Sequence, residues 1–307
     1  DTYGNWVVWR GFQVDGDTAP AVRTTKETFR VYPLSQKADP PEMNFVNVSG
    51  VPHSTVHRMD SAIYDEINEV VQAEPPTGEN AEVLGILASI GIRKGMEFEP
   101  DERMRRILAE AADVGAATVR TIMGQPRDDL FYFYPGESVW CDPFPGGDYH
   151  WLQNGAALLD ARAGFYFYAT GNTPAMAKKI IGKGSKYAFA FNDSDGNPFD
   201  GAKSYRVHVP PNAPAREFWA FTLYDNQTRS MLQTDARFPG IDSKSPALVA
   251  NDDGSYDVYF GPDAPAGSEG NWVQTVPGKG WNMLFRLYGP LEPWFEKTWR
   301  PGEPTLA

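Results

Sequence analysis

Three residues within one apolar stretch carry the side chains best suited to acid–base chemistry in this sequence. Between residues 149 and 177 the charged side chains are Asp160 and Arg162, and Tyr166 follows four positions after Arg162. An Asp whose pKa is raised by burial can act as a general acid or base, and an Arg can hold a carboxylate or stabilise an oxyanion. We therefore predict Asp160, Arg162 and Tyr166 as candidate catalytic residues.

The same pair of charges has an alternative, structural interpretation. A helix that is apolar around its whole circumference is normally buried, and an unpaired buried charge costs roughly several kcal/mol. Asp160 and Arg162 would then form an internal ion pair that locks a helix against a sheet. The sequence leaves both interpretations open.

A second group of residues is suited to holding a ligand. In the segment 281–288, Arg286 and Tyr288 alternate with Phe285 and Leu287, so a strand would place a cation and a phenol on one face. Apolar walls with a few convergent polar groups are the usual form of a small-molecule site. The residues that we predict to bind a ligand are Tyr168, Tyr224, Asn271, Trp272, Arg286 and Tyr288.

Two patterns have the ligand types of a metal site without completing one. The loop 192–200 carries aspartates and asparagines, whose oxygens suit calcium, but it lacks the terminal glutamate of an EF-hand loop. Asp, Asn and Gly are also the ordinary residues of a turn. His53 and His57 are four positions apart, and no third ligand accompanies them. We interpret the loop as a turn and predict no metal and no cofactor.

The elements that must position these residues follow from the spacing of apolar side chains. Strands are predicted at 3–12, 130–134, 138–141, 187–191, 204–209, 217–224, 256–260 and 281–288. Amphipathic helices are predicted between Asp60 and Pro75, at 81–90 and at 104–122, and residues 25–34 form a helix end or a strand. The predicted fold class is α+β, a predominantly antiparallel β-sandwich of jelly-roll-like form with a helical insert.

Three parts are predicted along the chain. Residues 1–59 would be the C-terminal part of an N-terminal β domain, 60–123 the helical insert, and 124–307 the C-terminal β-sandwich. The run 3–12 is apolar on both strand faces, with Trp6 and Val8 on one side and Val7 and Trp9 on the other. Such a strand requires cover on both sides. We therefore expect the chain to be a piece of a longer protein, covered by its own N-terminal segment or in a homo-oligomer.

Composition excludes several classes of partner. The chain has 307 residues, a formal net charge of −12 and a single cysteine, Cys141. Nucleic-acid binding requires clustered Lys and Arg, which this acidic chain does not show. One thiol supports neither an internal disulfide nor a zinc site, and no apolar run has the length of a membrane span. The expected partner is a small-molecule or sugar-like ligand, with no nucleic acid and no membrane span.

Long motifs along the chain resemble a known family. They include VVWRGF, FRVYPLSQ, DARAGFYFYATGNTPAM, YRVHVPPNAPAREFWAFTLYDNQTRSML and FRLYGPLEPWFEKTWRPGEP. The chain resembles an exported bacterial family of paired domains of unknown function, twelve-fifty-four followed by twelve-fourteen, and corresponds to the end of the first domain and all of the second. The resemblance implies a periplasmic or secreted protein, and it implies no particular chemistry.

Two functions are compatible with these observations. The first is a hydrolase-like or lyase-like enzyme that acts on a small organic or sugar-derived substrate in an aromatic-lined cleft. The alternative is a non-catalytic ligand-binding or interaction module of the cell envelope. A carboxylate positioned in the cleft favours the enzyme, whereas a cleft lined by Tyr, Trp and Arg alone favours the binding module.

Overall fold

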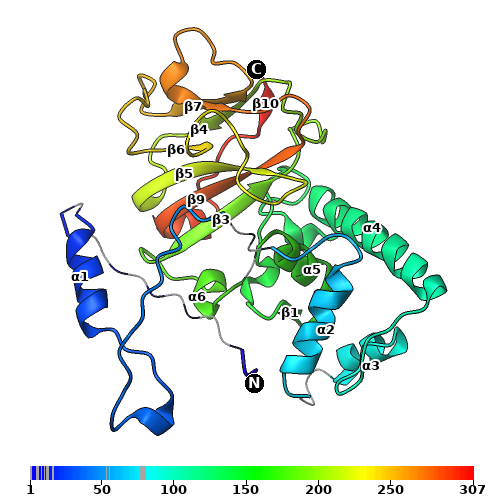
Figure 1. The fold of residues 1–307 in the computed structure, drawn as a ribbon. Coiled ribbons are helices and arrows are strands. Elements are labelled where there is room, and N and C mark those ends of the chain that lie inside the picture. The colour runs from blue at the N-terminus through cyan, green and yellow to red at the C-terminus, as the bar shows by residue number, and fades with distance from the viewer. Residues whose placement is uncertain are drawn as a thin grey trace. The chain divides into compact units, whose positions relative to one another are not determined.

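The computed structural model describes residues 2–4, 7, 9, 11, 14–15, 17–52, 54, 56–76, 81–169 and 171–307. Trp6, Val8 and His53, which take part in two of the sequence predictions, lie outside these residues. The chain divides into two compact units, one made of Asp1–Thr55 and Ala62–Arg105 and the other of Val56–Ser61 and Arg106–Ala307. The fold class is mixed α+β, as predicted (Figure 1).

Helices occur in both units. The α-helices of the described chain are α1 (Ala19–Thr28), α2 (Ile63–Ala73), α3 (Ala81–Ser89), α4 (Glu102–Gly124), α5 (Leu159–Tyr168), α6 (Pro174–Ala177) and α7 (Glu292–Phe295). Short 3-10 turns lie at Leu34–Gln36, Asp129–Phe131, Pro145–Gly147 and Glu269–Asn271. None of the helices in the described ranges combines the length and the apolarity that crossing a membrane requires.

The predicted helices α2, α3 and α4 are confirmed, and their ends have local causes. Asp101 caps the start of α4, because its Oδ1 accepts a hydrogen bond from the backbone N–H of Met104 at 2.7 Å. Lys94 caps the end of α2, where its Nζ donates to the carbonyl oxygens of Gln72 and Glu74 at 2.6 and 2.7 Å. Residues 25–34 contain the end of α1, one of the two predicted alternatives.

The strands of the described chain belong to the larger unit. They are β1 (Leu152–Gln153), β2 (Ala156–Ala157), β3 (Ser185–Ala190), β4 (Tyr205–Val209), β5 (Ala215–Asp225), β6 (Gly240–Asp242), β7 (Tyr256–Gly261), β8 (Trp272–Gln274), β9 (Trp281–Pro290) and β10 (Thr305–Leu306). In the described chain, one four-stranded sheet has the order β3-β9-β5-β6 and is antiparallel, and another has the order β10-β4-β7-β8, in which β7 and β8 are parallel.

The predicted strands of the C-terminal half are confirmed as β3, β4, β5, β7 and β9. Buried side chains alternate along β4 and β5 with the strand period, whereas the first five residues of β9 are all buried. Side chains from both sheets belong to one buried cluster, including Val207 and Phe260 from one sheet and Phe221, Phe285 and Leu287 from the other. This shared core holds the sheets as one body and leaves the outer face of β3, β9 and β5 available to other elements.

Two strand predictions are wrong, and the reasons are local. Residues 130–134 and 138–141 form a 3-10 turn and isolated bridges, because Asp128 accepts from the backbone N–H of Leu130 and starts a turn there. Strong β propensity in these short runs is overridden where no neighbouring strand supplies a continuous ladder. Half of the predicted strand 3–12 lies outside the described residues, so that strand stays a prediction.

Candidate functional site

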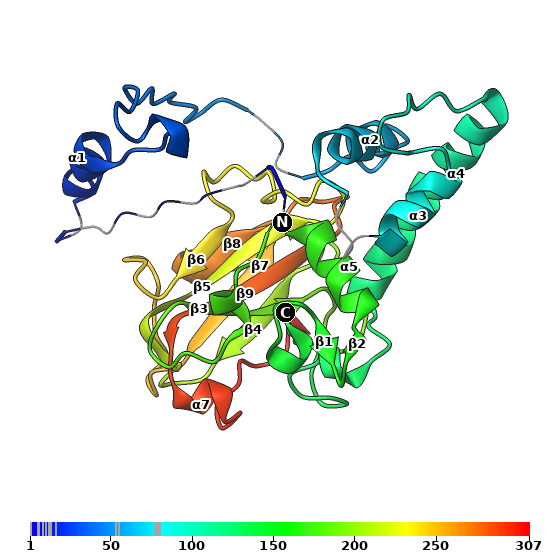
Figure 2. The same ribbon diagram turned by 90° about the horizontal axis from the view of Figure 1, so that it is seen from below.

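Helix α5 and the β3–β9–β5 face line a cavity of about 200 Å³, which we call the Arg286 cavity. Its walls are mostly apolar and aromatic, and its polar members come from several elements. The polar and phenolic residues that line it are Tyr168, Tyr187, Tyr224, Arg229, Asn282 and Arg286. Helix α5 lies next to α4 (Figure 2), so the cavity wall depends on how these two helices pack.

The structure brings four of the predicted ligand-binding residues together. Arg286 donates from Nη2 to the Tyr224 hydroxyl at 2.7 Å and from Nη1 to the Tyr288 hydroxyl at 3.4 Å. Tyr168 lines the same cavity from the last residue of α5. Burial raises the pKa of Tyr168 to about 12 and also raises the pKa of Tyr224, so both phenols keep their protons at neutral pH.

The other predicted site residues lie elsewhere. Asn271 and Trp272 lie at the start of β8 in the other sheet, where the Asn271 side chain bonds to the backbone of Val249 and the indole N–H of Trp272 donates to Gly261. They support that sheet and do not line the Arg286 cavity.

The three candidate catalytic residues lie on the outer side of α5. Asp160 forms its ion pair with Arg127, at 2.6 Å between Oδ2 and Nη2, instead of with Arg162. Arg162 is exposed, and Tyr166 is 44% exposed with its ring edge against Trp151. Helix α5 is therefore apolar on one face only. The exposed face could not be predicted, because the composition of residues 149–177 is apolar throughout.

Sequence reasoning missed Arg229, which is 5% exposed and lines the Arg286 cavity. Its guanidinium donates from Nη1 to Nε2 of His57 at 3.1 Å and to the carbonyl of Phe167 at 3.0 Å, and it lies 4.4 Å from the centre of the Phe167 ring. The other ring nitrogen of His57, Nδ1, lies 2.8 Å from the carbonyl of Arg58, so the network assigns its proton to Nδ1.

A tight turn places Arg229 in this position. Asp225 ends β5 and its Oδ1 accepts from the backbone N–H groups of Gln227 and Thr228, at 2.6 and 3.1 Å. Arg229 itself has a φ of 61°, a left-handed conformation that a non-glycine residue seldom adopts. Arg229 could not be predicted from its local sequence, because the segments that bury its side chain lie far away along the chain.

The cations of the Arg286 cavity have no anionic partner among the described residues. Within the described part of the chain, no carboxylate forms an ion pair with Arg229 or Arg286 within 4 Å, and the Nε of each is buried without a hydrogen bond. Burial lowers the pKa of Arg229, and the neighbouring Arg120 lowers it further. Because Arg stays protonated in proteins, the cavity holds uncompensated positive charge.

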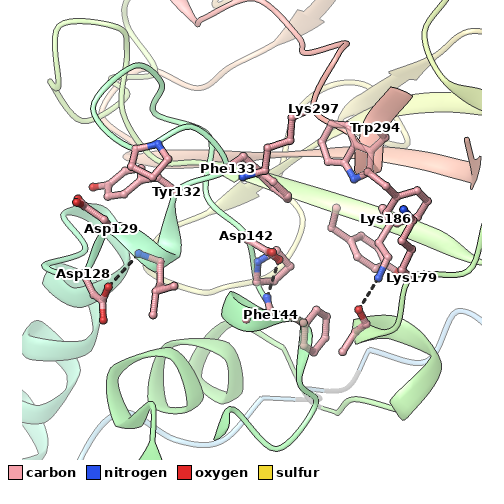
Figure 3. A pocket seen from close by; sticks show the side chains of 18 residues that line it. Asp128, Asp129, Tyr132, Phe133, Asp142, Phe144, Lys179, Lys186, Trp294 and Lys297 are labelled. Carbon is pink, nitrogen blue, oxygen red and sulfur yellow. Dashed lines mark hydrogen bonds between the residues drawn. The ribbon is translucent and has the colours of Figure 1, made fainter. Parts of the chain in front are cut away.

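A second, larger cleft of about 600 Å³ lies beside the first and shares Pro143, Phe144 and Tyr187 with it. We call it the Asp142 cleft, and Figure 3 shows Asp142 among its lining side chains. Burial raises the pKa of Asp142 to about 6, although the backbone N–H of Phe144 donates to its Oδ1 at 2.8 Å. Asp142 is not among the residues predicted from the sequence, where it is only an acid between a cysteine and a proline in an apolar run.

The loop 192–200 is organised by one aspartate. Asp193 is 2% exposed, and its Oδ1 accepts from the backbone N–H groups of Asp195 and Asn197 at 3.0 and 2.9 Å. This arrangement is a turn in which the carboxylate is engaged by the backbone.

Comparisons with known proteins give a partial match. Residues 184–292 match the family described as "Protein of unknown function (DUF1214)", which covers β3 to β9 and the start of α7. No curated protein matches the chain in sequence.

Two solved structures are similar in part. The VPA0106 protein from Vibrio parahaemolyticus is 17% identical, with a TM-score of 0.39, covering 87% of this chain and 58% of that chain. An uncharacterized protein from Burkholderia cenocepacia is 14% identical, with a TM-score of 0.32, covering 75% of this chain and 49% of that chain. This chain thus spans little more than half the length of the first structure and about half of the second.

Proposed function

We propose that the unit containing the two four-stranded sheets binds a small organic acid in the Arg286 cavity. The observation that carries the proposal is a pair of arginines, the buried Arg229 and the half-buried Arg286, each with a buried Nε and without a carboxylate partner among the described residues. A buried charge is normally paired, and a ligand carboxylate would supply the missing anion.

The size and walls of the cavity narrow the ligand class. An apolar cavity of about 150 Å³ can hold benzene, and the Arg286 cavity measures about 200 Å³. The hydroxyl of Tyr224 accepts from Arg286, which leaves its own proton to donate to a ligand oxygen. We therefore infer a compact monocarboxylate with an apolar or aromatic body, for which benzoate is a suitable probe.

Calorimetric titration with benzoate and with its uncharged analogue benzamide tests the proposal. We expect the parent protein to bind benzoate in preference to benzamide, and Arg286→Met to weaken benzoate binding about 10- to 100-fold, since charged hydrogen bonds contribute about 1.5–3 kcal/mol. The matched control is Arg216→Met, an exposed arginine of β5 that pairs with Glu217 at 2.8 Å. Equal binding of benzoate and benzamide, or full binding by Arg286→Met, would contradict the proposal.

We also propose the jelly-roll-like sandwich for the two four-stranded sheets. It is supported by the single core cluster to which both contribute. For the domain organisation, we propose a division into residues 1–59, 60–123 and 124–307.

Export and the paired-domain arrangement are proposals as well. They are supported by the motifs outside residues 184–292 that resemble the paired family. We propose that the protein is periplasmic or secreted; signal-dependent export of the full-length precursor in its native host, followed by cell fractionation, tests this.

An enzyme is the second candidate function. The Arg286 cavity contains no Asp, Glu or His among its described lining residues, which favours binding there. The adjoining Asp142 cleft does contain a carboxyl group, so a hydrolase-like or lyase-like activity would belong to that cleft.

A further inference from the structure

The Asp142 cleft contains an amine in an unusual setting. Lys186 of β3 lines the cleft (Figure 3). Its Nζ donates to the carbonyl oxygens of Met176 and Ala177, each at 2.8 Å. These carbonyls lie in the last turn of α6. The two acceptors match the two hydrogens of a neutral amine, whereas a protonated amine has a third hydrogen for which the described residues provide no recorded acceptor.

The other amines of the cleft have different surroundings. Lys179 and Lys297 also line it, and both are exposed. Lys179 Nζ lies 5.2 Å from the centre of the Phe295 ring, and Lys297 Nζ lies 5.8 Å from that of Tyr134, both within the range of a cation–π contact. Burial lowers the pKa of Lys186, although Asp142 opposes this effect. A lowered pKa leaves more of the Lys186 amine unprotonated, and the unprotonated amine is the nucleophilic form.

Asp142 completes the set of groups that imine chemistry requires. Its Oδ1 accepts from the backbone N–H of Phe144, which fixes the carboxyl group in the cleft wall and leaves Oδ2 with no recorded hydrogen bond. In the described structure no ion pair within 4 Å joins Asp142 to Lys186, so direct contact between them does not occupy the amine. In Figure 3 Asp142 lies between the side of the cleft that carries Tyr132 and the side that carries Lys186.

We propose that Lys186 is a nucleophilic amine that forms an imine with a carbonyl compound bound in the Asp142 cleft, with Asp142 as the proton-transfer group. The Nζ lone pair forms a bond to the carbonyl carbon, and one N–H proton moves to the carbonyl oxygen to give a carbinolamine. The Asp142 carboxyl then protonates the hydroxyl, the C–O bond breaks and water leaves. The products are a protonated imine on Lys186, one water and the Asp142 carboxylate.

This inference specifies a chemistry for the second candidate function, the enzyme, and is independent of the carboxylate site. A neutral carbonyl probe keeps the two separable, because acetone has no carboxylate for Arg286 to bind. An alternative role for Lys186 is structural, as a cap on the last carbonyls of α6, and the capping role alone predicts no special reactivity.

Reductive trapping of the intact protein distinguishes these roles. The protein is incubated with acetone and sodium cyanoborohydride near neutral pH, and the alkylated lysines are quantified by peptide mass spectrometry over time. We expect Lys186 to be alkylated at least about 10-fold faster than Lys179 and Lys297, since burial lowers the pKa of Lys186 and so enlarges the fraction of its amine that carries a free lone pair. Alkylation of Lys186 no faster than these two neighbours would overturn the proposal.

The role of Asp142 is tested in the same assay. Asp142→Asn keeps an acceptor for the Phe144 N–H and removes the transferable proton, so Lys186 alkylation should slow by about 100-fold, the lower end of general acid–base effects. Lys179 alkylation serves as the internal control. An unchanged Lys186 rate in Asp142→Asn would contradict the assignment of Asp142, and circular dichroism of the variant confirms that it is folded.

Discussion

At the residue scale, the chemistry of this protein depends on which charges are paired. Asp160 and Arg127 form an ion pair near the surface, where the Asp160 side chain is 32% exposed. Arg229 and Arg286 have hydrogen bonds to neutral groups only, within the part of the chain that the structure describes. The two arginines without a carboxylate partner among the described residues, and not the Asp160–Arg127 ion pair, therefore indicate the candidate site.

Asp142 provides a prediction on pH dependence. Its pKa of about 6 in the folded protein exceeds the ordinary value of 3.8, so folding favours the protonated carboxyl. The stability that this proton confers is complete below about pH 4 and is lost as the pH rises through 6. Asp142→Asn should therefore exceed the parent in free energy of unfolding at pH 8, by up to about 3 kcal/mol, with little difference at pH 4.

Urea denaturation of both proteins at the two pH values measures this difference. The control is Asp129→Asn, which makes the same Asp-to-Asn change at an exposed carboxylate of the same cleft. A parent that equals Asp142→Asn at pH 8 would show that the carboxyl is more solvated than its position in the cleft wall indicates.

At the scale of elements, the walls of the Arg286 cavity depend on the contact between α4 and α5. Gly164 of α5 is buried against Met123 of α4, and a Cβ at position 164 would meet the Met123 Sδ and lie 2.8 Å from its Cγ. The absence of a side chain at Gly164 thus allows the close approach of the helices. The same helix carries Phe165 and Tyr168 into the cavity.

Substitution of two helical glycines should have opposite effects. Gly164→Ala should destabilise the protein by about 1–2 kcal/mol, because overpacking costs about 1–3 kcal/mol and outweighs the better helix propensity of Ala. Gly115→Ala in α4 meets nothing within 4 Å and should stabilise by up to about 1 kcal/mol. Thermal and urea denaturation measure both, and a stabilising Gly164→Ala would mean that Met123 can move aside at little cost.

At the scale of the whole molecule, the two units differ in how much apolar surface they bury. The larger unit has the continuous core of both four-stranded sheets. In the smaller unit, α1 has no buried residue, and Val31, Leu34 and Val46 are 64%, 83% and 73% exposed. Exposed apolar side chains in such numbers favour association, so the homo-oligomer expected from the sequence stays our prediction.

Limited proteolysis at several protein concentrations tests this prediction. If a second copy covers the smaller unit, trypsin should cut at Arg23, Lys26, Arg30 and Lys37 slowly at high concentration and faster on dilution. Intact-mass spectrometry identifies the fragments, and sedimentation velocity gives the mass of the assembly. Rapid cleavage at these sites at every concentration would contradict a covering partner.

Local patterns were sufficient for the elements whose stability is set by their own periodicity. The sequence predicted α2, α3 and α4 and the strands β4, β5, β7 and β9, because each presents apolar residues at a helical or strand period. It also placed Arg286 and Tyr288 on one strand face, since alternation along a strand is a property of consecutive residues. The sequence-based prediction was wrong at 130–141 and did not show which face of the helix within 149–177 is exposed. In both segments the apolar residues have no clear helical or strand period.

Only the tertiary structure decided which polar residues share a cavity. Arg229 acquires its partner His57 across 172 positions, and Asp160 pairs with Arg127 across 33 instead of with Arg162 two positions away. Burial of a side chain depends on the segments that pack over it, so neither Asp142 nor Arg229 could be distinguished in sequence from an ordinary turn residue. Secondary structure is specified by neighbours along the chain, whereas desolvation, the source of the perturbed charges here, arises from neighbours in space.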